Sequence, residues 1–408
     1  RGAGNGAKPQ PFRSFGVVGA GTMGSGIALA ALQSGFPAVM TDTDPTALKR
    51  AATRIGDELS KNVAAGRMTA EAAEKAQAGL TLSHDLASLS QADVIIEAVI
   101  EEMQAKQAVF ARIAAVARPD AVLATNTSYL DIDPIAQATG RPGQVIGLHF
   151  FSPAHVMKLL EVVPGSASKA ETVATGLAVA KALGKQPVQA GNAFGFIGNR
   201  IYAAYRSACE FMLEDGALPE QVDAALKEFG FAMGPFAVAD LSGLDIAWRM
   251  RQQQAGTRDP RARYVTIPDR LCEAGRLGRK TGAGYYRYDA AGKAHVDEAV
   301  TEIVLAESAA KGITRQQLTS QEICRRALAA IVNEAGLVLE EGVAASAGDV
   351  DVVMVNGYGF PRWKGGPLHW ARGQDCAALI ADCADAAAVA GPQKRVADLT
   401  ALGLCGGK

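Results

Sequence analysis

Apolar residues follow two arrangements along the first half of the chain. Short, nearly continuous apolar runs alternate with longer segments in which Ala, Leu, Glu, Lys and Arg recur at helical spacing, as strands and helices would produce. We expect strands at Phe15–Gly19, Ala38–Thr41, Val94–Val99, Ala121–Thr125, Val145–Phe150, Leu159–Val163 and Pro187–Ala190. We expect helices at Ser25–Gln33, Pro45–Ala65, Ala105–Ala117 and Lys169–Leu183. This order predicts an α/β fold with a largely parallel sheet, which binds its ligand at the carboxyl ends of the strands.

The chain changes character after Gly195. Strand-like runs nearly vanish, apart from Tyr285–Tyr288, and helices rich in Ala, Leu and Glu dominate. We therefore place a domain boundary near residue 194, between an α/β domain and an all-helical part.

The helical part contains an internal repeat. The words Leu213-Glu-Asp-Gly216, Val222-Asp223 and Gly234-Pro235 recur in the same order as Leu339-Glu-Glu-Gly342, Val350-Asp351 and Gly366-Pro367. Words this short can match by chance, but their preserved order on similar helical backgrounds favours a duplication. Two copies in one chain could pack around a pseudo-twofold axis, as two subunits of a symmetric dimer would.

A glycine pattern follows the first expected strand. Gly19, Gly21 and Gly24 have the spacing Gly-x-Gly-x-x-Gly where that strand meets a helix. The first glycine permits a tight turn, the second lets the backbone approach a pyrophosphate, and the third lets the helix pack closely on the strand. The helix N-terminus offers free N–H groups to phosphates. A glycine-rich turn in another kind of α/β domain would share this spacing, but here both flanking strands and an acidic residue are also present.

Asp42 is that acidic residue. It lies 18 residues after Gly24, at the end of the second expected strand. A carboxylate there accepts hydrogen bonds from the adenosine ribose and would repel a 2′-phosphate. Threonines flank it, and neither supplies the positive charge of an arginine. The sequence therefore predicts NAD rather than NADP as the cofactor.

Composition narrows the class of protein. The 408 residues suffice for two or three domains, and a formal net charge of −1 gives no bulk attraction to nucleic acid or to an acidic membrane. The longest apolar runs are far too short to span a bilayer. The six cysteines include no Cys-x-x-Cys pair, and the five histidines are not paired at helical spacing. We therefore expect reduced thiols, a bacterial-like cytoplasm and no metal site.

The first 13 residues have a composition typical of a linker. They contain several glycines and two prolines, and they lack an initiator Met and a hydrophobic signal core. We infer that the chain is the downstream part of a longer polypeptide, or a piece cut from one.

Four polar residues interrupt or end apolar elements: Ser128, His149, Glu161 and Asn199. Each alone has a structural reading. A serine after a strand caps a turn, a histidine beside phenylalanines is a core side chain, and a glutamate in an apolar run faces water from an edge strand. An unpaired buried carboxylate would be costly, however. Together, on the ligand-binding side of a dinucleotide sheet, the four form a coherent set for oxidising an alcohol.

Longer motifs surround these residues in a fixed order. They are Asn126-Thr-Ser128, His149-Phe-Phe, Val156-Met-Lys-Leu-Leu-Glu161-Val-Val, Gly195-Phe-Ile-Gly-Asn199-Arg, Met233-Gly-Pro-Phe236 and Gly278-Arg-Lys-Thr-Gly-Ala-Gly-Tyr-Tyr286. Over about residues 14–288 this set resembles the L-3-hydroxyacyl-CoA dehydrogenase family. The stretch 320–375, with Asn356-Gly-Tyr-Gly-Phe-Pro361 and Gly365-Gly-Pro367, resembles the extra C-terminal domain of multifunctional fatty-acid oxidation proteins. In those proteins an enoyl-CoA hydratase domain precedes the dehydrogenase part.

The resemblance implies a role for each of the four polar residues. His149 is the general base that takes the 3-hydroxyl proton as hydride passes to the nicotinamide. Glu161 pairs with the imidazole, orients it and stabilises the imidazolium. Ser128 and Asn199 hydrogen-bond the substrate and hold it near the nicotinamide, so that Ser128 also lies at the cofactor.

The resemblance also implies further cofactor contacts. Glu101 and Lys106 match positions near the cofactor ribose, although a surface pair at a helix start would have the same spacing. Met23 and Lys280 are further candidates of this kind.

The chain departs from the family pattern in three places. Ser152-Pro153 stands where many relatives have Asn-Pro, which puts a cofactor contact there in doubt. Tyr129 replaces a small serine and would reshape the mouth of the pocket. The second copy of the repeat has Cys324-Arg-Arg-Ala-Leu in place of Phe-Ile-Gly-Asn-Arg, so we expect it to be a structural partner without its own active site.

These observations predict a Rossmann-type domain followed by two related all-α domains. The expected parts are a linker at 1–13, the NAD-binding domain at 14–194, a first helical domain at 195–295 and a second at 296–408. We expect the active site in the cleft between the sheet and the first helical domain. Because the repeat can replace a dimer partner, we expect a monomer.

The expected activity is NAD-dependent oxidation of (3S)-3-hydroxyacyl-CoA to 3-oxoacyl-CoA in fatty-acid β-oxidation. An acyl-CoA is the expected substrate, and an N-terminal enoyl-CoA hydratase domain or a thiolase is a possible partner. A biosynthetic short-chain 3-hydroxybutyryl-CoA dehydrogenase is one alternative, which the duplicated domain disfavours. A non-catalytic dinucleotide- or CoA-binding assembly module is the other, and the intact set of four polar residues argues against it.

Overall fold

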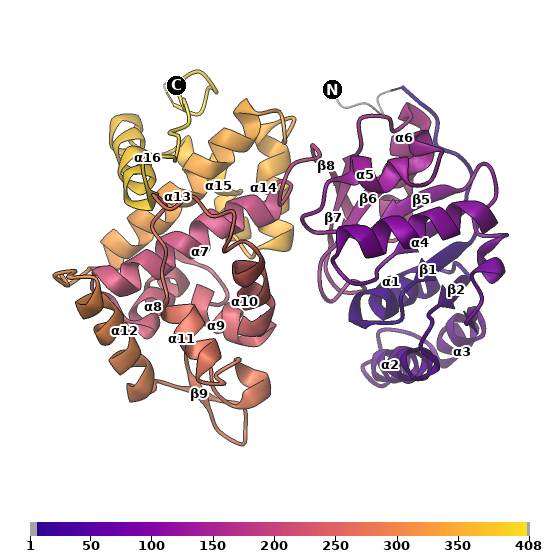
Figure 1. Ribbon diagram of the computed structural model, residues 1–408, viewed down its shortest axis with the longest axis horizontal. Helices are drawn as coiled ribbons and strands as arrows, with labels where there is room; N and C mark the ends of the chain where they lie inside the picture. The colour runs from indigo at the N-terminus through magenta and orange to yellow at the C-terminus, as the bar shows by residue number, and fades with distance from the viewer. Residues whose placement is uncertain (1–5, 406–408) are drawn as a thin grey trace. The chain divides into compact units, whose positions relative to one another are not determined.

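The computed structural model describes residues 6–405, which fall into two compact units. The sheet unit comprises the residues up to Asn199 together with Gly342–Gly357, and the helical unit comprises Arg200–Glu341 and the residues from Tyr358 onward. In Figure 1 the part of the sheet unit up to Asn199 runs from indigo to magenta, its segment Gly342–Gly357 is orange, and the helical unit runs from pink to yellow.

An eight-stranded sheet forms the centre of the sheet unit. Its strands, in the spatial order β3-β2-β1-β4-β5-β6-β7-β8, are β1 (Phe15–Val18), β2 (Ala38–Thr41), β3 (Leu80–Ser83), β4 (Val94–Glu97), β5 (Val122–Thr125), β6 (Val145–Phe150), β7 (Leu159–Pro164) and β8 (Gln186–Gln189). The first six run parallel, whereas β7 is antiparallel to β6 and β8 is parallel to β7. The prediction of a mostly parallel Rossmann-type sheet is confirmed.

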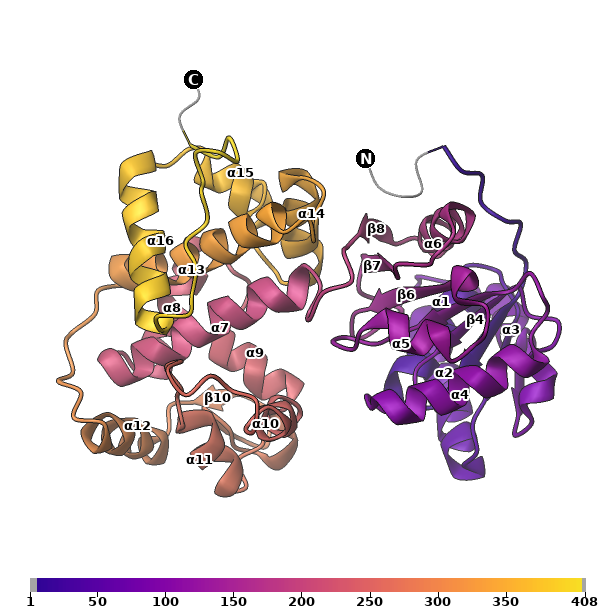
Figure 2. The same cartoon turned by 45° about the horizontal axis from the view of Figure 1, so that its top comes forward.

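Seven α-helices belong to the described part of the sheet unit. They are α1 (Thr22–Gln33), α2 (Pro45–Ala64), α3 (Ala70–Ala78), α4 (Met103–Val116), α5 (Ile132–Gln137), α6 (Ala170–Ala182) and α14 (Ala347–Gly357), with 3₁₀ turns η1 (Leu86–Leu89) and η2 (Pro142–Gln144). Strand β1 is buried throughout, since helices cover both faces of the sheet (Figure 2).

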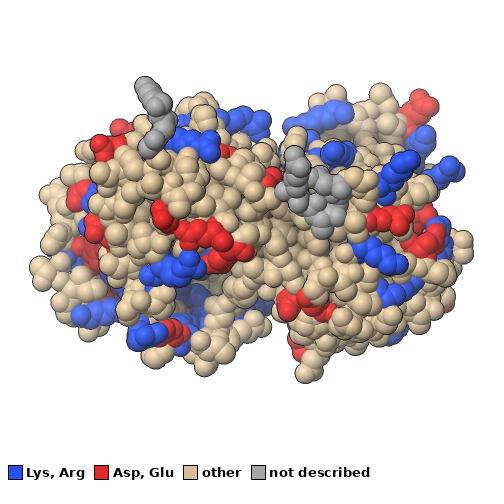
Figure 3. All heavy atoms as spheres, turned by 90° about the horizontal axis from the view of Figure 1, so that it is seen from above, with Lys and Arg blue, Asp and Glu red and all other residues tan. Residues whose placement is uncertain are grey.

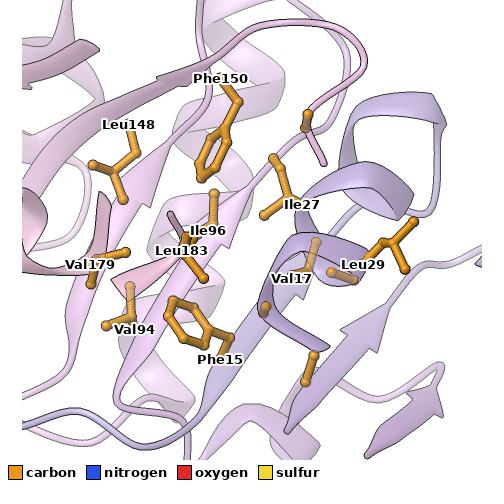
Figure 4. Close-up of a cluster of buried hydrophobic side chains, with 14 of the residues drawn as sticks. Phe15, Val17, Ile27, Leu29, Val94, Ile96, Leu148, Phe150, Val179 and Leu183 are labelled. Atoms are coloured by element: carbon orange, nitrogen blue, oxygen red, sulfur yellow. The ribbon is translucent and has the colours of Figure 1, made fainter. Parts of the chain in front are cut away.

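The apolar core lies where the strands meet α1 and α6. Phe15 and Val17 are two residues apart on β1, so both point to this face. They are fully buried, as are Ile27 of α1 and Val179 of α6 (Figure 4). Burial of this much apolar surface is the main stabilisation of the unit. It fixes the carboxyl ends of the strands, where the candidate residues lie.

Helices make up most of the helical unit. They are α7 (Gly198–Asp215), whose first two residues belong to the sheet unit, α8 (Pro219–Phe229), α9 (Pro235–Ser242), α10 (Leu244–Gln253), α11 (Ile267–Glu273), α12 (Glu298–Ala310), α13 (Ser320–Glu340), α15 (Pro367–Ala371) and α16 (Cys376–Ala390). Two 3₁₀ turns, η3 (Arg279–Thr281) and η4 (Arg362–Lys364), and the hairpin of β9 (Arg287–Tyr288) and β10 (Ala294–His295) complete it. Helix α13 is buried almost all round, as expected of a helix at the centre of a bundle.

The repeated sequence words occupy matching places in the helices. The first word of each copy ends α7 or α13, the second lies in α8 or α14, and the Gly-Pro pair begins α9 or α15. The duplication and the bounds of the four predicted parts stay predictions. Helix α14, from the predicted second helical domain, groups by its contacts with the sheet unit, where Gly357 packs on Leu159.

Two further observations concern the predicted linker and membrane association. Residues 1–5 of the linker lie outside the described residues, whereas Gln10 donates a hydrogen bond to Thr175 and Phe12 packs against the apolar core of the sheet unit. Within residues 6–405, none of the helices combines the length and apolar character that crossing a membrane requires.

Candidate active site

The glycine turn has the geometry that its spacing predicts. Gly19 has a φ of +105°, and a Cβ atom on it would lie 2.6 Å from the carbonyl oxygen of Ala98. A Cβ atom on Gly24 would lie 1.8 Å from the oxygen of Gly19, so only glycine lets α1 pack this closely. Gly21, the N-cap of α1, has open space around it. The turn therefore offers backbone N–H groups at a helix N-terminus to a phosphate group.

Asp42 lies directly beside this turn. Its Oδ2 accepts a hydrogen bond of 2.7 Å from the backbone N–H of Ala20, and its Oδ1 accepts one of 2.9 Å from Asp44. The carboxylate thus holds the turn at the carboxyl end of β2, the place that the ribose of a dinucleotide occupies in such folds. Met23, another predicted cofactor residue, is partly buried against the apolar core.

His149 and Glu161 form a buried pair. They are direct partners in the antiparallel register of β6 and β7, and Nδ1 of His149 lies 2.7 Å from Oε2 of Glu161. Their exposed fractions are 3% and 0%, so the alternative in which Glu161 faces water is wrong. A carboxylate accepts hydrogen bonds, so this geometry favours the tautomer in which Nδ1 is the donor and Nε2 the acceptor.

The second oxygen of Glu161 is held by the start of α7. Oε1 accepts hydrogen bonds from the backbone N–H groups of Ile197, at 3.2 Å, and Gly198, at 3.0 Å. The preceding Gly195 and Phe196 have φ values of +76° and +50°, a left-handed turn that aims these N–H groups at the carboxylate. The positive end of the helix dipole favours a negative charge at this position.

Ser128 reaches the other nitrogen of the histidine ring. Its Oγ lies 3.1 Å from Nε2 of His149, and its carbonyl oxygen accepts a hydrogen bond of 3.4 Å from Nδ2 of Asn199. The rings of Phe151 and Phe196 lie 4.4 and 5.5 Å from the imidazole. The sheet unit therefore brings together all four polar residues that the sequence singled out, within an apolar surround.

Glu101 and Lys106 lie next to Ser128. Oε1 of Glu101 accepts hydrogen bonds from the hydroxyl of Thr127, at 2.6 Å, and from the backbone N–H groups of Ser128, at 2.8 Å, and Tyr129, at 3.2 Å. Lys106 is 1% exposed, and its Nζ lies 3.4 Å from Oε2 of Glu101. Their predicted contacts with the cofactor ribose stay predictions.

The structure also places Lys280 and two of the residues that depart from the family pattern. Lys280 lies in the helical unit and forms an ion pair with Asp245. The Ser152–Pro153 peptide is cis, and the ring of Tyr129 packs on that of Phe194 at 5.1 Å.

Two polar residues near the site were not predicted from the sequence to be site residues. Oδ1 of Asn126 accepts a hydrogen bond of 2.8 Å from the backbone N–H of Phe150, which ties the end of β5 to the end of β6. Glu97 ends the apolar strand β4 with a fully buried carboxylate. The signal that singled out Glu161, an acidic residue within an apolar run, also marks Glu97.

Comparisons with known proteins identify the family. Residues 14–193 match the NAD binding domain of 3-hydroxyacyl-CoA dehydrogenase, and residues 195–288 match the C-terminal domain of the same family. The peroxisomal bifunctional enzyme of Cavia porcellus is 44% identical over 378 residues, which are 90% of this chain and 52% of that protein. The chain thus spans about half the length of the curated relatives it matches.

Solved structures agree with this result. The 3-hydroxybutyryl-CoA dehydrogenase of Escherichia coli K12 is 30% identical, with a TM-score of 0.78 over 92% of this chain and 94% of that one. The dehydrogenase part of multifunctional enzyme 1 from C. elegans is 27% identical, with a TM-score of 0.69 over 96% of this chain and 90% of that one.

The comparisons also correct the expected location. The composition led us to expect a bacterial-like cytoplasm, but curated relatives from animals and plants are named peroxisomal or glyoxysomal. The expectation was wrong because reduced, unpaired cysteines do not distinguish these compartments.

The two matched domains and the structural similarity over 92% of the chain lead to one conclusion. The chain belongs to the 3-hydroxyacyl-CoA dehydrogenase family.

Proposed function

We propose that the chain oxidises (3S)-3-hydroxyacyl-CoA to 3-oxoacyl-CoA with NAD⁺, as the dehydrogenase part of a fatty-acid β-oxidation protein. The observation that carries this proposal is the buried His149–Glu161 pair, whose Nε2 faces the hydroxyl of Ser128. The chain is an NAD-dependent oxidoreductase by family.

The residues at the glycine turn fit NAD. Open space around Gly21 leaves room for a pyrophosphate at the N-terminus of α1, and Asp42 lies beside the turn with a carboxylate suited to ribose hydroxyls. The nicotinamide supplies the hydride acceptor when NAD⁺ is bound. The protein supplies orientation and the movement of the proton.

His149 removes the proton from the substrate hydroxyl. The lone pair on Nε2 accepts it while the C3 hydrogen leaves as hydride, so the alcohol becomes a ketone. Glu161, held by Ile197 and Gly198, keeps Nδ1 protonated and stabilises the imidazolium that forms. In the reductive direction the same nitrogen returns the proton.

Ser128 and Asn199 position the substrate oxygen. The hydroxyl of Ser128 lies at hydrogen-bond distance from Nε2, so an alcohol that bonds to this hydroxyl is placed beside the base. The bond from Asn199 to the carbonyl of Ser128 fixes the turn that carries it. Positioning of this kind lowers the barrier by aligning the reacting atoms before reaction.

A specific observation supports a second candidate, a short-chain 3-hydroxybutyryl-CoA dehydrogenase. The E. coli protein of that name matches 92% of this chain, so the helical repeat does not distinguish the two functions, contrary to the expectation from the sequence. Selectivity for acyl-chain length separates them instead.

The test follows NADH formation at 340 nm with (3S)-3-hydroxyacyl-CoA substrates of about 4 to 16 carbons, with the (3R) isomers as controls. We expect turnover of medium or long (3S) chains. Turnover of the four-carbon substrate alone would favour the short-chain alternative, and no NADH from any (3S) substrate would contradict the proposed function.

We also propose that an enoyl-CoA hydratase activity accompanies this one in the full-length protein. The names "bifunctional" and "multifunctional" of the curated relatives, of which the chain spans about half, support a second activity. Hydration of 2-enoyl-CoA by the full-length protein, and its absence from this chain alone, would test this.

A further inference from the structure

Glu97 is a buried carboxylate that has no role in the proposed proton and hydride transfer. It is the last residue of β4, it is 0% exposed, and in the sheet it pairs with Val18 on one side and Thr125 on the other. It therefore lies between the glycine turn that follows β1 and the turn that follows β5 and carries Ser128. A buried charge at this position is costly unless it is paired and hydrogen-bonded.

Both oxygens of Glu97 are bound. Oε1 accepts hydrogen bonds of 2.7 Å from the backbone N–H of Val99 and from Nζ of Lys106, and Oε2 accepts one of 2.7 Å from the hydroxyl of Thr125. The carboxylate is thus fixed by β5, by the turn after β4 and by α4. Three well-placed donors hold a buried acceptor in one orientation.

Lys106 connects Glu97 to the active-site turn. Its ammonium group is buried, and it lies 2.7 Å from Oε1 of Glu97 and 3.4 Å from Oε2 of Glu101. The other oxygen of Glu101 accepts the hydrogen bonds from Thr127, Ser128 and Tyr129 described above. One cation shared by two carboxylates therefore sets where Glu101 lies, and Glu101 sets the turn that carries Ser128.

We propose that Glu97 is a positioning residue for the dehydrogenase reaction, and that it holds Ser128 against Nε2 of His149 through Lys106 and Glu101. The inference rests on the proposed function. If Glu97 carried no charge, Glu101 would be the only one of these two carboxylates to attract Lys106. This attraction would draw Glu101 away from the N–H groups of the 127–129 turn. Ser128 would then leave its position beside the base.

The first test compares Glu97→Gln with Glu102→Gln. Glutamine keeps the shape of Glu97 and an oxygen for Val99 or Thr125 but removes the charge. Glu102 is an exposed glutamate at the N-cap of α4, the helix that carries Lys106. We expect Glu97→Gln to lower kcat by about 10- to 100-fold, the scale of a small misplacement of reacting groups. We expect Glu102→Gln to stay within about twofold of the unaltered protein. Unchanged kcat in folded Glu97→Gln overturns the proposal.

A double-mutant cycle separates positioning from general damage. If Glu97 acts through Ser128, Glu97→Gln combined with Ser128→Ala lowers kcat no further than Ser128→Ala alone, within about twofold. Losses that multiply overturn the proposal. If Glu97→Gln does not fold, Thr125→Val removes only the hydroxyl that binds Glu97, and the same cycle applies with the same two outcomes.

A crystal structure of Glu97→Gln gives a readout that does not depend on turnover. We expect the distance from Ser128 Oγ to His149 Nε2 to exceed hydrogen-bond length, and retention of the present 3.1 Å overturns the proposal. An unaltered protein that forms no NADH contradicts the proposed function instead, so the two failures are distinguishable.

Discussion

His149 and Glu161 stand directly opposite each other on β6 and β7, with 2.7 Å between Nδ1 and Oε2. Opposite residues in an antiparallel pair point to the same face of the sheet, which is why the two side chains meet. A shift of the register by one residue would turn Glu161 to the other face. The pair therefore depends on the antiparallel register of two strands at one end of an otherwise parallel sheet.

Two substitutions in the glycine turn should separate cofactor binding from folding. Gly21→Ala adds a methyl group in open space, at a φ of −73°, so we expect unfolding like that of the unaltered protein. The methyl group would block the approach of a phosphate, so we expect NADH affinity to fall about tenfold or more. Gly24→Ala would place Cβ 1.8 Å from the oxygen of Gly19 and should lower the melting temperature itself.

Thermal unfolding without cofactor and NADH binding by fluorescence measure the two effects of these glycine substitutions. Wild-type NADH affinity in Gly21→Ala would contradict the proposed position of the pyrophosphate.

Asp42→Ala should narrow the preference for NAD over NADP. The substitution removes the carboxylate that the ribose hydroxyls would bind and the charge that would repel a 2′-phosphate, so NAD affinity should fall about 10- to 100-fold while NADP affinity changes less. Binding constants for both cofactors measure this, with Asp57→Ala as the control because Asp57 is exposed on α2. An unchanged ratio of the two affinities would remove the ribose role of Asp42.

Lys185 should make stability depend on pH above neutrality. Burial, with the nearby charge of Lys158, lowers the pKa of Lys185 to about 8 from an ordinary value of 10.5. Between these values the unfolded chain binds more protons than the folded one, so this group makes the free energy of unfolding rise with pH from about 8 to 10.5. Its ammonium donates to the carbonyls of Ala154 and Met157, in the loop between β6 and β7.

The difference between the unaltered protein and Lys185→Met, in urea unfolding from pH 7 to 10, isolates this contribution. We expect this difference in the free energy of unfolding to increase with pH above about 8. Lys49→Met, which alters an exposed lysine, should show the same pH dependence as the unaltered protein. Identical pH dependence in all three proteins would show that Lys185 titrates normally.

The chain should be monomeric in solution. In the helical unit α13, from the second copy of the repeat, packs against α8, from the first, and Phe229 contacts Phe360 and Trp370. A surface covered in this way within one chain is not available to a second copy. Sedimentation velocity should give one species near 42.3 kDa, and a tight dimer through the helices would contradict the prediction.

Much of the fold followed from the sequence because its signals are local. The strand at Ala38–Thr41 has the predicted bounds, and β1 and β6 differ from prediction by at most one residue. Strand β3 was missed because Leu80–Ser83 is a short edge strand with exposed side chains and no long apolar run. The reversed direction of β7 and β8 was also not predicted, since an apolar run does not specify its direction.

The site was predictable to the same extent. Polar residues that end buried strands pointed to Ser128, His149 and Glu161, and the structure brings them together. The sequence did not show how Glu161 is held, because its partners are backbone N–H groups at Ile197 and Gly198. Nor did it show that Lys106 is buried between two carboxylates, since that depends on how α4 packs on the sheet.

The most direct test of the central claim is the turnover of His149→Gln with saturating NAD⁺ and a (3S)-3-hydroxyacyl-CoA. His295→Gln, in an exposed hairpin of the helical unit, is the matched control. We predict that kcat falls about 10²- to 10⁴-fold in His149→Gln, the usual effect of losing a positioned base, while NADH binding and the control stay unchanged. Turnover of His149→Gln equal to that of the unaltered protein would show that this imidazole is not the base.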